Sequence, residues 1–281
     1  MRITKYMTGP IQANTYLVYD EETKKGFMVD PGGYEPRLTA QIKDEKVDLE
    51  YIILTHGHGD HIGGVDAFKK DFPQVKVVAC KAEDKMLHDP GDNCSIEMFR
   101  KAITIDADIL VDDRETLKVG NMELTFIHTP GHTEGGMCIY VDGHLFSGDT
   151  LFCRSIGRTD FPGGNFNDII KSIKEKLFAF PDDTVVLPGH MGQTTIGDEK
   201  KGNPLVALMQ RQPPPTAYQT RGSTAHIWEQ LFSELSKRIF LALSPQFFRR
   251  ESCWPFFFLP TASARWAGFP NPFDMNGFYW L

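Results

Sequence analysis

Short apolar runs alternate with amphipathic stretches along the first 207 residues of the chain. Apolar runs bounded by Gly, Pro, Asn or Asp predict strands, whereas apolar residues that recur every three or four positions predict helices. Gly120-Asn121 and Asp142-Gly143, each between two such runs, predict tight hairpins. The predicted strands are Asn14–Tyr19, Gly26–Val29, Tyr51–Leu54, Val75–Ala79, Leu117–Val119, Met122–Ile127, Met137–Val141, His144–Ser147 and Thr184–Leu187. The predicted helices are Tyr34–Glu45, Val65–Phe72 and Phe166–Phe178.

The pattern changes abruptly after about Val206. Residues 208–281 hold all four tryptophans, ten of the 21 phenylalanines and eight of the 18 prolines, but only four of the 37 acidic residues. Their net charge is +3, against −10 for residues 1–207. Only Ile227–Leu243 has helical spacing. We therefore expect one domain over residues 1–207, followed by an aromatic and Pro-rich extension, poorly ordered or adventitious, over 208–281.

The overall composition narrows the class of protein. A net charge of −7 gives no support for a nucleic-acid partner. No run approaches the ~18 apolar residues of a transmembrane segment, and the N-terminus has no apolar run after its positive charges, so no signal peptide is expected. The five cysteines are widely spaced without a CxxC pair, which indicates reduced thiols and a cytoplasmic location.

A cluster of histidines directly follows the predicted strand Tyr51–Leu54. The run THGHGDHIGG holds His56, His58, Asp60 and His61 within six residues. Imidazole nitrogens and carboxylate oxygens are ligands that zinc and iron share. The interleaved glycines allow the backbone to turn, so that these side chains can converge. The HxHxDH spacing therefore predicts a metal site rather than a solvated polar loop.

Three later residues follow predicted strands in the same way. His132 follows Met122–Ile127, Asp149 follows the strand that begins at His144, and His190 follows the last predicted strand. Each alone is typical of a buried hydrogen-bonded group. Together with HxHxDH, they are better explained as further metal ligands, because ligands commonly bind in loops at the carboxyl ends of strands.

The motifs THGHGDHIGG, TPGHTEGG, FSGDTLF and LPGH occur in this order. They resemble the motif series of the metallo-β-lactamase superfamily, and within it the glyoxalase II-like hydrolases. The runs SIGRTDFPGG and PGHMGQTTIGDEKKGNP resemble the short bacterial members of that group. The resemblance covers about residues 1–206. It implies an α+β fold, a four-layer αββα sandwich with the metal site at one edge of its two sheets, followed by an unmatched C-terminal extension.

The resemblance also implies a set of ligands for two divalent metal ions. Zinc is favoured, with iron and manganese as alternatives. Asp60 would both bind metal and orient the nucleophile, a water whose pKa the metals lower towards ~7. The first metal would be held by His56, His58 and His132, the second by Asp60, His61 and His190, with Asp149 bridging both.

The expected activity is hydrolysis of a small-molecule thioester of glutathione or another low-molecular-weight thiol. A thioester suits zinc because the leaving thiolate has affinity for the metal. Residues 208–281 do not resemble the helical domain with which two-domain glyoxalase II enzymes bind glutathione, so the thiol is left open. The rival is a persulfide dioxygenase with one iron, whose ligands would be a subset such as His56, His132 and Asp149. The segment QTTIGDEKKGNP favours the hydrolase.

Residues outside the ligand set have alternative interpretations. Arg158 and Asp160 in the run GRTD are interpreted either as an ion pair that supports the site or, for Arg158, as a contact to an anionic substrate. Other branches of the superfamily fit less well. Position 58 is His where flavodiiron proteins carry Glu, and Asp149 stands where β-lactamases lack the bridging carboxylate. An RNA-processing nuclease is disfavoured, because it would be expected to carry a basic arm and the acidic first 207 residues offer none. The remaining histidines are expected to be structural or exposed: His88, His128, His144 and His226.

We predict that a chain truncated after about residue 210 keeps full activity and is more soluble than the whole chain. The favoured explanation of residues 208–281 is out-of-frame translation past a natural end near Val206, and the alternative is a segment that binds a membrane surface. Apolar clusters such as Trp254–Leu259 would promote aggregation when exposed. Turnover, metal content and sedimentation of the two chains test this prediction. Loss of metal or turnover on truncation would contradict it.

Overall fold

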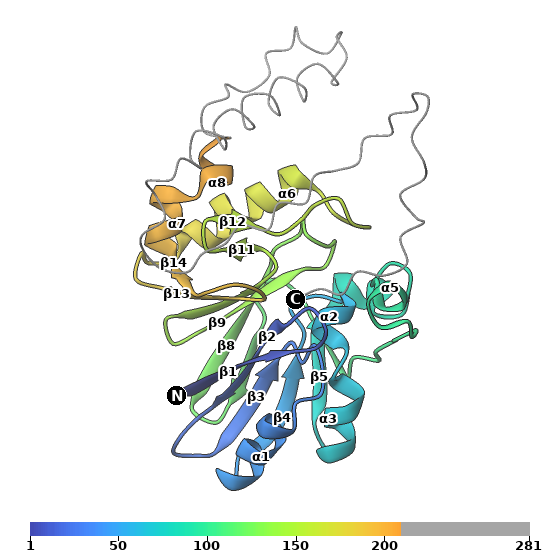
Figure 1. Ribbon diagram of the computed structural model, residues 1–281. Coiled ribbons are helices and arrows are strands. Elements are labelled where there is room, and N and C mark those ends of the chain that lie inside the picture. Colours follow the sequence, from blue (N-terminus) through green and yellow to red (C-terminus); the bar gives the residue numbers. More distant parts are fainter. Residues whose placement is uncertain (209–281) are drawn as a thin grey trace, which may run out of the picture.

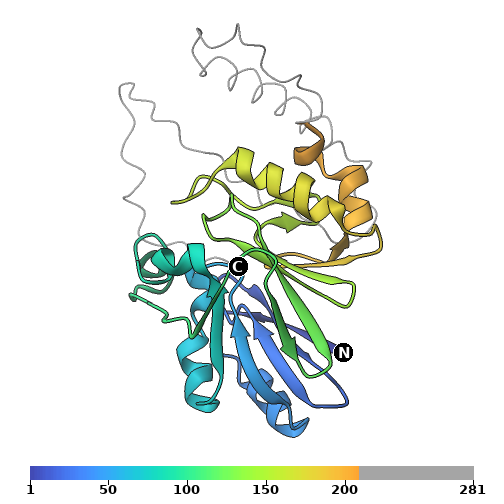
Figure 2. The same cartoon turned by 180° about the vertical axis from the view of Figure 1, so that it is seen from behind.

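Two six-stranded β-sheets form the centre of the molecule, and helices cover both outer faces (Figure 1, Figure 2). The computed structural model describes residues 1–208. The predicted extension therefore lies outside the described residues from 209 onwards. Figure 1 shows α1 (Pro36–Asp44) and α3 (Val65–Asp71) on one side of the sheets, and α6 (Phe166–Lys171) and α7 (Ile196–Gly202) on the opposite side. The order of layers is thus αββα, which confirms the predicted fold.

The first sheet has the order β1-β2-β3-β4-β5-β6. Its first three strands are antiparallel, and β3 to β6 are parallel. Parallel neighbours need crossover connections, which α1 and α3 provide for β4 and β5. The strands are β1 (Arg2–Thr8), β2 (Ala13–Tyr19), β3 (Lys25–Val29), β4 (Asp48–Ile53), β5 (Lys76–Cys80) and β6 (Ile109–Val111).

The second sheet has the order β14-β13-β10-β9-β8-β7. Both predicted hairpins are present, because β7 pairs with β8 and β9 pairs with β10 in antiparallel fashion. β13 is parallel to β10 and is reached through α6. The strands are β7 (Thr116–Val119), β8 (Met122–His128), β9 (Met137–Val141), β10 (His144–Gly148), β13 (Val185–Pro188) and β14 (Thr194–Thr195), beside a small separate pair, β11 (Leu151–Phe152) and β12 (Ser155–Ile156).

Alternation along the strands distributes apolar side chains between layers. In β2, Tyr16 and Val18 point between the two sheets, whereas Leu17 and Tyr19 point towards the helices on the outer face. Successive side chains of a strand point to opposite faces, so a strand buried on both faces must be apolar throughout. Between the sheets, the Phe146 ring meets the rings of Tyr16 and Phe27 edge-on, with centroids 5.2 and 6.1 Å apart. This contact fixes one sheet against the other.

All nine predicted strands are present, with small differences at their ends, but several elements are additional. β1 was not predicted, because its side chains are mostly exposed or half-buried and its sequence RITKYMT mixes polar with apolar residues. The predicted helix Phe166–Phe178 begins as α6. It continues as a π-helical segment, Ser172–Lys176, and ends as a 3-10 turn, Leu177–Ala179. The other additional helices are α2 (Gly59–Ile62), η1 (Lys81–Glu83), α4 (Asp84–Leu87), α5 (Ser95–Phe99), α7 and α8 (Pro204–Leu208).

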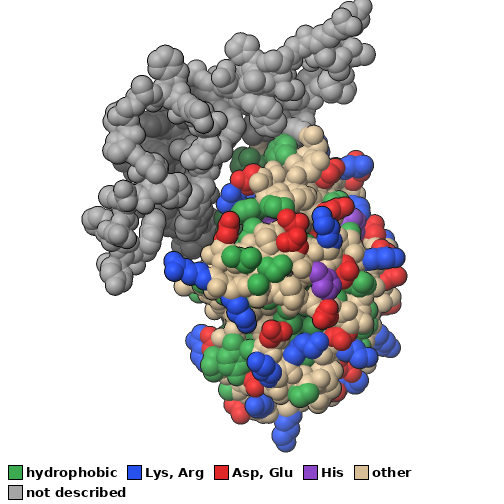
Figure 3. Space-filling view, turned by 90° about the vertical axis from the view of Figure 1, so that its right-hand side faces the viewer, with side chains coloured by type: hydrophobic (Ala, Val, Ile, Leu, Met, Phe, Trp, Pro, Cys, Tyr) green, Lys and Arg blue, Asp and Glu red, His purple; other side chains and the backbone are tan. Residues whose placement is uncertain are grey.

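Charged side chains of both signs lie on the surface of the described residues, and several thiols are buried beneath it. Positive and negative side chains are interspersed over the face seen in Figure 3. No helix within residues 1–208 is both long enough and apolar enough to cross a membrane. Cys80, Cys94 and Cys138 are buried thiols outside any disulfide.

Candidate metal centre

All seven predicted ligands lie just beyond the carboxyl ends of four strands. β4 leads into His56 and His58, and then into the short helix α2, whose first turn carries Asp60 and His61. The strands β8, β10 and β13 lead in the same way into His132, Asp149 and His190. Because β4 belongs to one sheet and the other three strands belong to the second, the site joins both sheets at one edge.

The first group of side chains is His56, His58 and His132. One nitrogen of each ring lies within 4.8 Å of those of the other two. His58 Nδ1 and His132 Nε2 are 2.9 Å apart. All three residues are at most 4% exposed. Three imidazoles that converge in this way could hold a divalent cation.

The second group is Asp60, His61 and His190, whose ligand atoms also lie within 4.8 Å of one another. Asp60 Oδ2 is 3.2 Å from His190 Nε2 and 3.7 Å from His61 Nε2. The side chain of His190 is 22% exposed, whereas that of His61 is fully buried. This group is therefore open to solvent on the side of His190.

Asp149 lies between the two groups. Its Oδ1 is 3.5 Å from His61 Nε2, and its Oδ2 is 3.7 Å from His132 Nε2 and 3.6 Å from His190 Nε2. One carboxylate thus faces a ring of the first group and two rings of the second. The position suits a ligand shared between two cations.

Buried polar atoms without partners indicate that the two groups fit metal ions. Within residues 1–208, His56 Nε2, His58 Nε2, His61 Nε2 and Asp149 Oδ1 have no hydrogen-bond partner. Each such atom costs about 1–3 kcal/mol when left unsatisfied. A Cβ at Gly189 would lie 2.3 Å from Asp149 Oδ1, so only glycine leaves this oxygen accessible. The donor set of nitrogens and carboxylate oxygens is the one that zinc, iron and manganese accept.

Hydrogen bonds orient three of the imidazole rings. His61 Nδ1 lies 2.9 Å from Asp30 Oδ2, which also accepts a bond from Thr55 Oγ1 at 2.6 Å. His56 Nδ1 is 3.1 Å from the same hydroxyl, and His132 Nδ1 donates to the carbonyl of Arg158 at 2.7 Å. A proton on Nδ1 leaves the lone pair of Nε2 free for a metal. The role of Asp30 was not predicted from the sequence.

Glu83, which was also not predicted, joins the two loops that carry the first group. Its Oε1 accepts a bond from the backbone N–H of Gly57 at 2.7 Å, and its Oε2 accepts one from that of Gly135 at 2.8 Å. Glu83 is 1% exposed, and burial raises the pKa of its carboxyl. Gly57 lies between His56 and His58. The position of these two rings relative to His132 therefore depends on Glu83.

Burial and neighbouring charges shift the pKa values of the ligands in opposite directions. Burial lowers the pKa of His56 and His132, and lowers that of His58 to about 3. Burial opposes the charged form of His61 too, but Asp60, Asp149 and Asp30 raise its pKa to about 10. The three imidazoles of the first group are therefore neutral at pH 7. In the second group, the positive charge of His61 is balanced by the negative charge of Asp60.

Arg158 and Asp160 form an ion pair beside the first group. Arg158 Nε and one terminal nitrogen lie 2.9 and 2.7 Å from the two carboxylate oxygens of Asp160. The guanidinium also lies over the Phe161 ring, 4.2 Å from its centroid. Phe161 in turn packs edge-on against His58, with centroids 5.2 Å apart. Arg158 is half-exposed, so its charge remains accessible to solvent.

The other histidines of the described chain lie outside the two groups. His88 Nε2 is 2.9 Å from Asp106, and His128 Nε2 is 2.9 Å from the carbonyl of Glu134. His144 Nδ1 is 2.9 Å from the carbonyl of Asp142. His226 lies beyond the described residues. The three that are described have the structural or surface positions expected from the sequence.

The sequence profile of the Metallo-beta-lactamase superfamily matches residues 8–190. The chain belongs to this superfamily. The hydroxyacylglutathione hydrolase GloC of Haemophilus influenzae is 36% identical to this member over 203 residues, which cover 69% of the chain and 93% of GloC.

Solved structures of the superfamily share the fold. The structure titled BLEG-1 B3 metallo-beta-lactamase has a TM-score of 0.68 and 38% identity, covering 73% of this chain and 99% of that one. The di-iron-bound form of TTHA1623 has a TM-score of 0.62 and 30% identity, over 72% and 98% of the two chains. ETHE1 from Myxococcus xanthus has a TM-score of 0.59 and 26% identity, over 76% and 92%.

We predict that the metal-free protein loses stability as the pH falls below about 6.5. Three buried imidazoles have a lowered pKa in the folded state, so the unfolded chain binds more protons in this range. Each group lowers the free energy of unfolding by up to about 1.4 kcal/mol per pH unit. His61 and His190, whose pKa is raised, give a contribution that is already complete below pH 6.5 and does not oppose this slope.

Urea unfolding of the metal-free protein between pH 6 and 5 measures this dependence. The variant His58→Asn removes one of the three groups. It should reduce the slope by about one proton, or about 1.4 kcal/mol per pH unit. A free energy of unfolding that stays constant over this range would contradict the prediction.

Proposed function

We propose that this protein hydrolyses small thioesters of the hydroxyacyl-glutathione type, or of another low-molecular-weight thiol, with two divalent metal ions, zinc being favoured. The observation that carries the proposal is the pair of converging ligand groups with Asp149 between them. The relative GloC, named as a hydroxyacylglutathione hydrolase, supports the substrate class. The di-iron form of TTHA1623 supports a site for two metals and keeps iron as an alternative. Buried thiols outside any disulfide fit a cytoplasmic location.

The residues would divide between the two metals as the resemblance implies. His56, His58 and His132 would hold the first, and Asp60, His61 and His190 the second, with Asp149 shared. When bound, the two ions supply a hydroxide at neutral pH and polarise a carbonyl oxygen. The orientation of the rings by Asp30, Thr55 and the Arg158 carbonyl favours this use of Nε2.

Asp60 would orient the attacking water. Burial alone would raise the pKa of its carboxyl, but His61 and His190 hold it well below its usual value. The carboxylate is therefore ionised at neutral pH and can only accept hydrogen bonds. An acceptor fixed beside His190 can hold the proton of a water so that a lone pair faces the thioester carbonyl carbon. Asp60 would thus combine binding of the second metal with positioning of the nucleophile.

Arg158 would bind the anionic part of the substrate. Its guanidinium is held beside the first group by Asp160 and by the Phe161 ring, which packs on His58. Phe161 packs against His58 and forms an apolar wall beside the first group. A thioester with its carbonyl at the metals and a carboxylate at Arg158 would lie along this wall.

A persulfide dioxygenase with one iron is the second candidate. The run GRTD favours it, because this run resembles one that persulfide dioxygenases keep. In that case His56, His132 and Asp149 would hold the iron. These three residues also lie together in this chain, because Asp149 Oδ2 is 3.7 Å from His132 Nε2 and the rings of His56 and His132 have centroids 4.8 Å apart. The two candidates differ in whether the second group takes a metal.

We predict about two metals per chain in protein expressed with both zinc and iron supplied. The same protein should hydrolyse S-lactoylglutathione. Asp149→Ala should lower kcat by at least about 100-fold, because both ligand groups lose the carboxylate that lies between them. His88→Ala, at a surface histidine outside both groups, is the matched control and should retain full activity. One iron per chain, together with oxygen uptake on persulfide and no thioester turnover, would contradict the proposal and support the dioxygenase.

We also predict that Arg158→Ala raises KM about tenfold for S-lactoylglutathione and leaves kcat within about twofold, since one charged contact to the substrate is lost. KM for a thioester with a neutral thiol should stay unchanged. Asp160→Asn is the discriminating control, because it breaks the ion pair but keeps the guanidinium. Equal losses in both variants, on both substrates, would indicate that the ion pair only supports the site.

A further inference from the structure

The loop that carries His190 connects β13 to β14. It runs over Gly189 and Met191, and Met191 has the left-handed value φ = 66°, which is unfavourable for a side chain other than glycine. The backbone N–H of Gly189 donates to the carbonyl of Gly148 at 2.8 Å, next to Asp149. This bond attaches one side of the loop to the second sheet. The other side faces β2 of the first sheet.

Asn14 on β2 makes three hydrogen bonds to this loop. Its backbone N–H donates to the carbonyl of Gly189 at 2.7 Å. Its side-chain amide donates to the carbonyls of Pro188 and Met191, at 2.9 and 3.0 Å. Asn14 is 2% exposed. Pro188 and Gly189 precede His190 and Met191 follows it, so Asn14 holds the backbone on both sides of the imidazole.

Tyr16, two residues further along β2, provides a second attachment. Its hydroxyl donates to the carbonyl of Pro188 at 2.7 Å, and burial raises the pKa of the phenol, so the hydroxyl keeps its proton. The ring packs edge-on against Phe146 in the layer between the sheets. The position of the hydroxyl is therefore fixed by the core.

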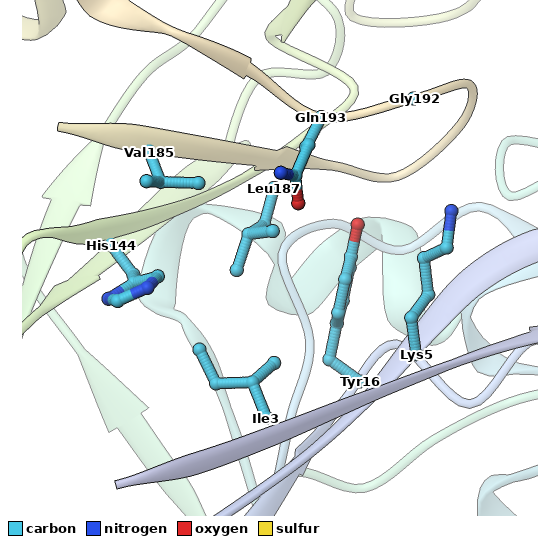
Figure 4. A pocket seen from close by; sticks show the side chains of 8 residues that line it. All are labelled: Ile3, Lys5, Tyr16, His144, Val185, Leu187, Gly192 and Gln193. Carbon is cyan, nitrogen blue, oxygen red and sulfur yellow. The ribbon is translucent and has the colours of Figure 1, made fainter. Parts of the chain in front are cut away.

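A cavity of about 540 Å³ lies behind this loop. Figure 4 shows Tyr16 rising from β2 into the space below the segment from Leu187 to Gln193. On this side the loop borders open space instead of packed side chains. Hydrogen bonds therefore hold the loop on this side, and Asn14 and Tyr16 of β2 bond its backbone, whereas Asp60 reaches only the His190 ring. The lining residues are Ile3, Lys5, Tyr16, His144, Val185, Leu187, Gly192 and Gln193.

We propose that Asn14 and Tyr16 are positioning residues for His190 and thereby determine the affinity of the second metal group. The inference rests on the proposed function, because it concerns the second metal of the same centre. These two side chains donate hydrogen bonds to Pro188 and Met191, and not to His56, His58 or His132. Loss of either one should therefore weaken one metal and spare the other.

The variants Tyr16→Phe and Asn14→Ala test the inference in the full-length protein loaded with zinc. Tyr16→Phe keeps the ring in the core and removes only the hydroxyl. Tyr6→Phe is the matched control, because it removes a hydroxyl of the same sheet that donates to Gln41 at 2.8 Å, away from the loop. Titration with a zinc-binding chelator gives the affinity of each metal. Hydrogen–deuterium exchange of residues 187–193 in the metal-free protein gives a second readout that requires neither metal nor activity.

We expect both variants to bind the second zinc roughly 10–100-fold more weakly and the first with unchanged affinity. Exchange in residues 187–193 should be about tenfold faster, since each lost hydrogen bond stabilises this loop. Tyr6→Phe should match the wild type in both measurements. Unchanged affinity for the second zinc together with unchanged exchange, or equal weakening of both metals, overturns the inference.

The two proposals fail in distinguishable ways. A wild-type protein that binds two zinc ions but hydrolyses no thioester contradicts the proposed activity, and the chelator titration still decides the role of Asn14 and Tyr16. A wild-type protein that binds only one metal contradicts the two-metal centre. The exchange rates of residues 187–193 then decide whether these two side chains hold the loop, and unchanged rates overturn the inference.

Discussion

The structure depends on holding several buried lone pairs close together without neutralising them by hydrogen bonds. Within the described chain, His56, His61 and Asp149 each direct an unpartnered atom into the same small region. In the two histidines, Thr55 and Asp30 bind the Nδ1 atoms, so the Nε2 atoms stay free. Such an arrangement is unfavourable in isolation, because each unsatisfied buried atom costs about 1–3 kcal/mol. The rest of the fold must therefore be stable enough to maintain it.

The two-sheet architecture explains how that stability reaches the site. The first sheet supplies the HxHxDH segment through β4, and the second supplies His132, Asp149 and His190. Neither sheet alone could form either group of ligands or place Asp149 between them. The relative position of the sheets is set by interleaved rings such as Phe146 against Tyr16 and Phe27. Core packing between the sheets is thus a condition for the geometry of the site.

The ease of prediction differed between ligands and the residues that support them. The predicted ligands follow strands and occur in short motifs, so local sequence marked all seven as candidates, and the resemblance to the superfamily implied that they meet at one edge. The supporting residues act over long separations. Glu83 reaches Gly135 across 52 positions, and Asn14 reaches Pro188 across 174. Single buried polar residues of this kind have no local pattern, because their partners are decided only when the strands assemble. The edge strand β1 was missed for a related reason, since its mixed sequence lacks the apolar run of a central strand.

The two ligand groups differ in how firmly the fold encloses them, and this difference bears on the choice between the two candidate reactions. The first group is fully buried, joined across its loops by Glu83 and covered by Phe161. The second includes His190, which is partly exposed on a loop that borders a cavity. Displacing that loop would remove one ligand from the second group and leave the first intact. The same ligand set could then support either two-metal or one-metal chemistry. The reaction would depend less on the presence of seven ligands than on how tightly β2 holds the loop after β13.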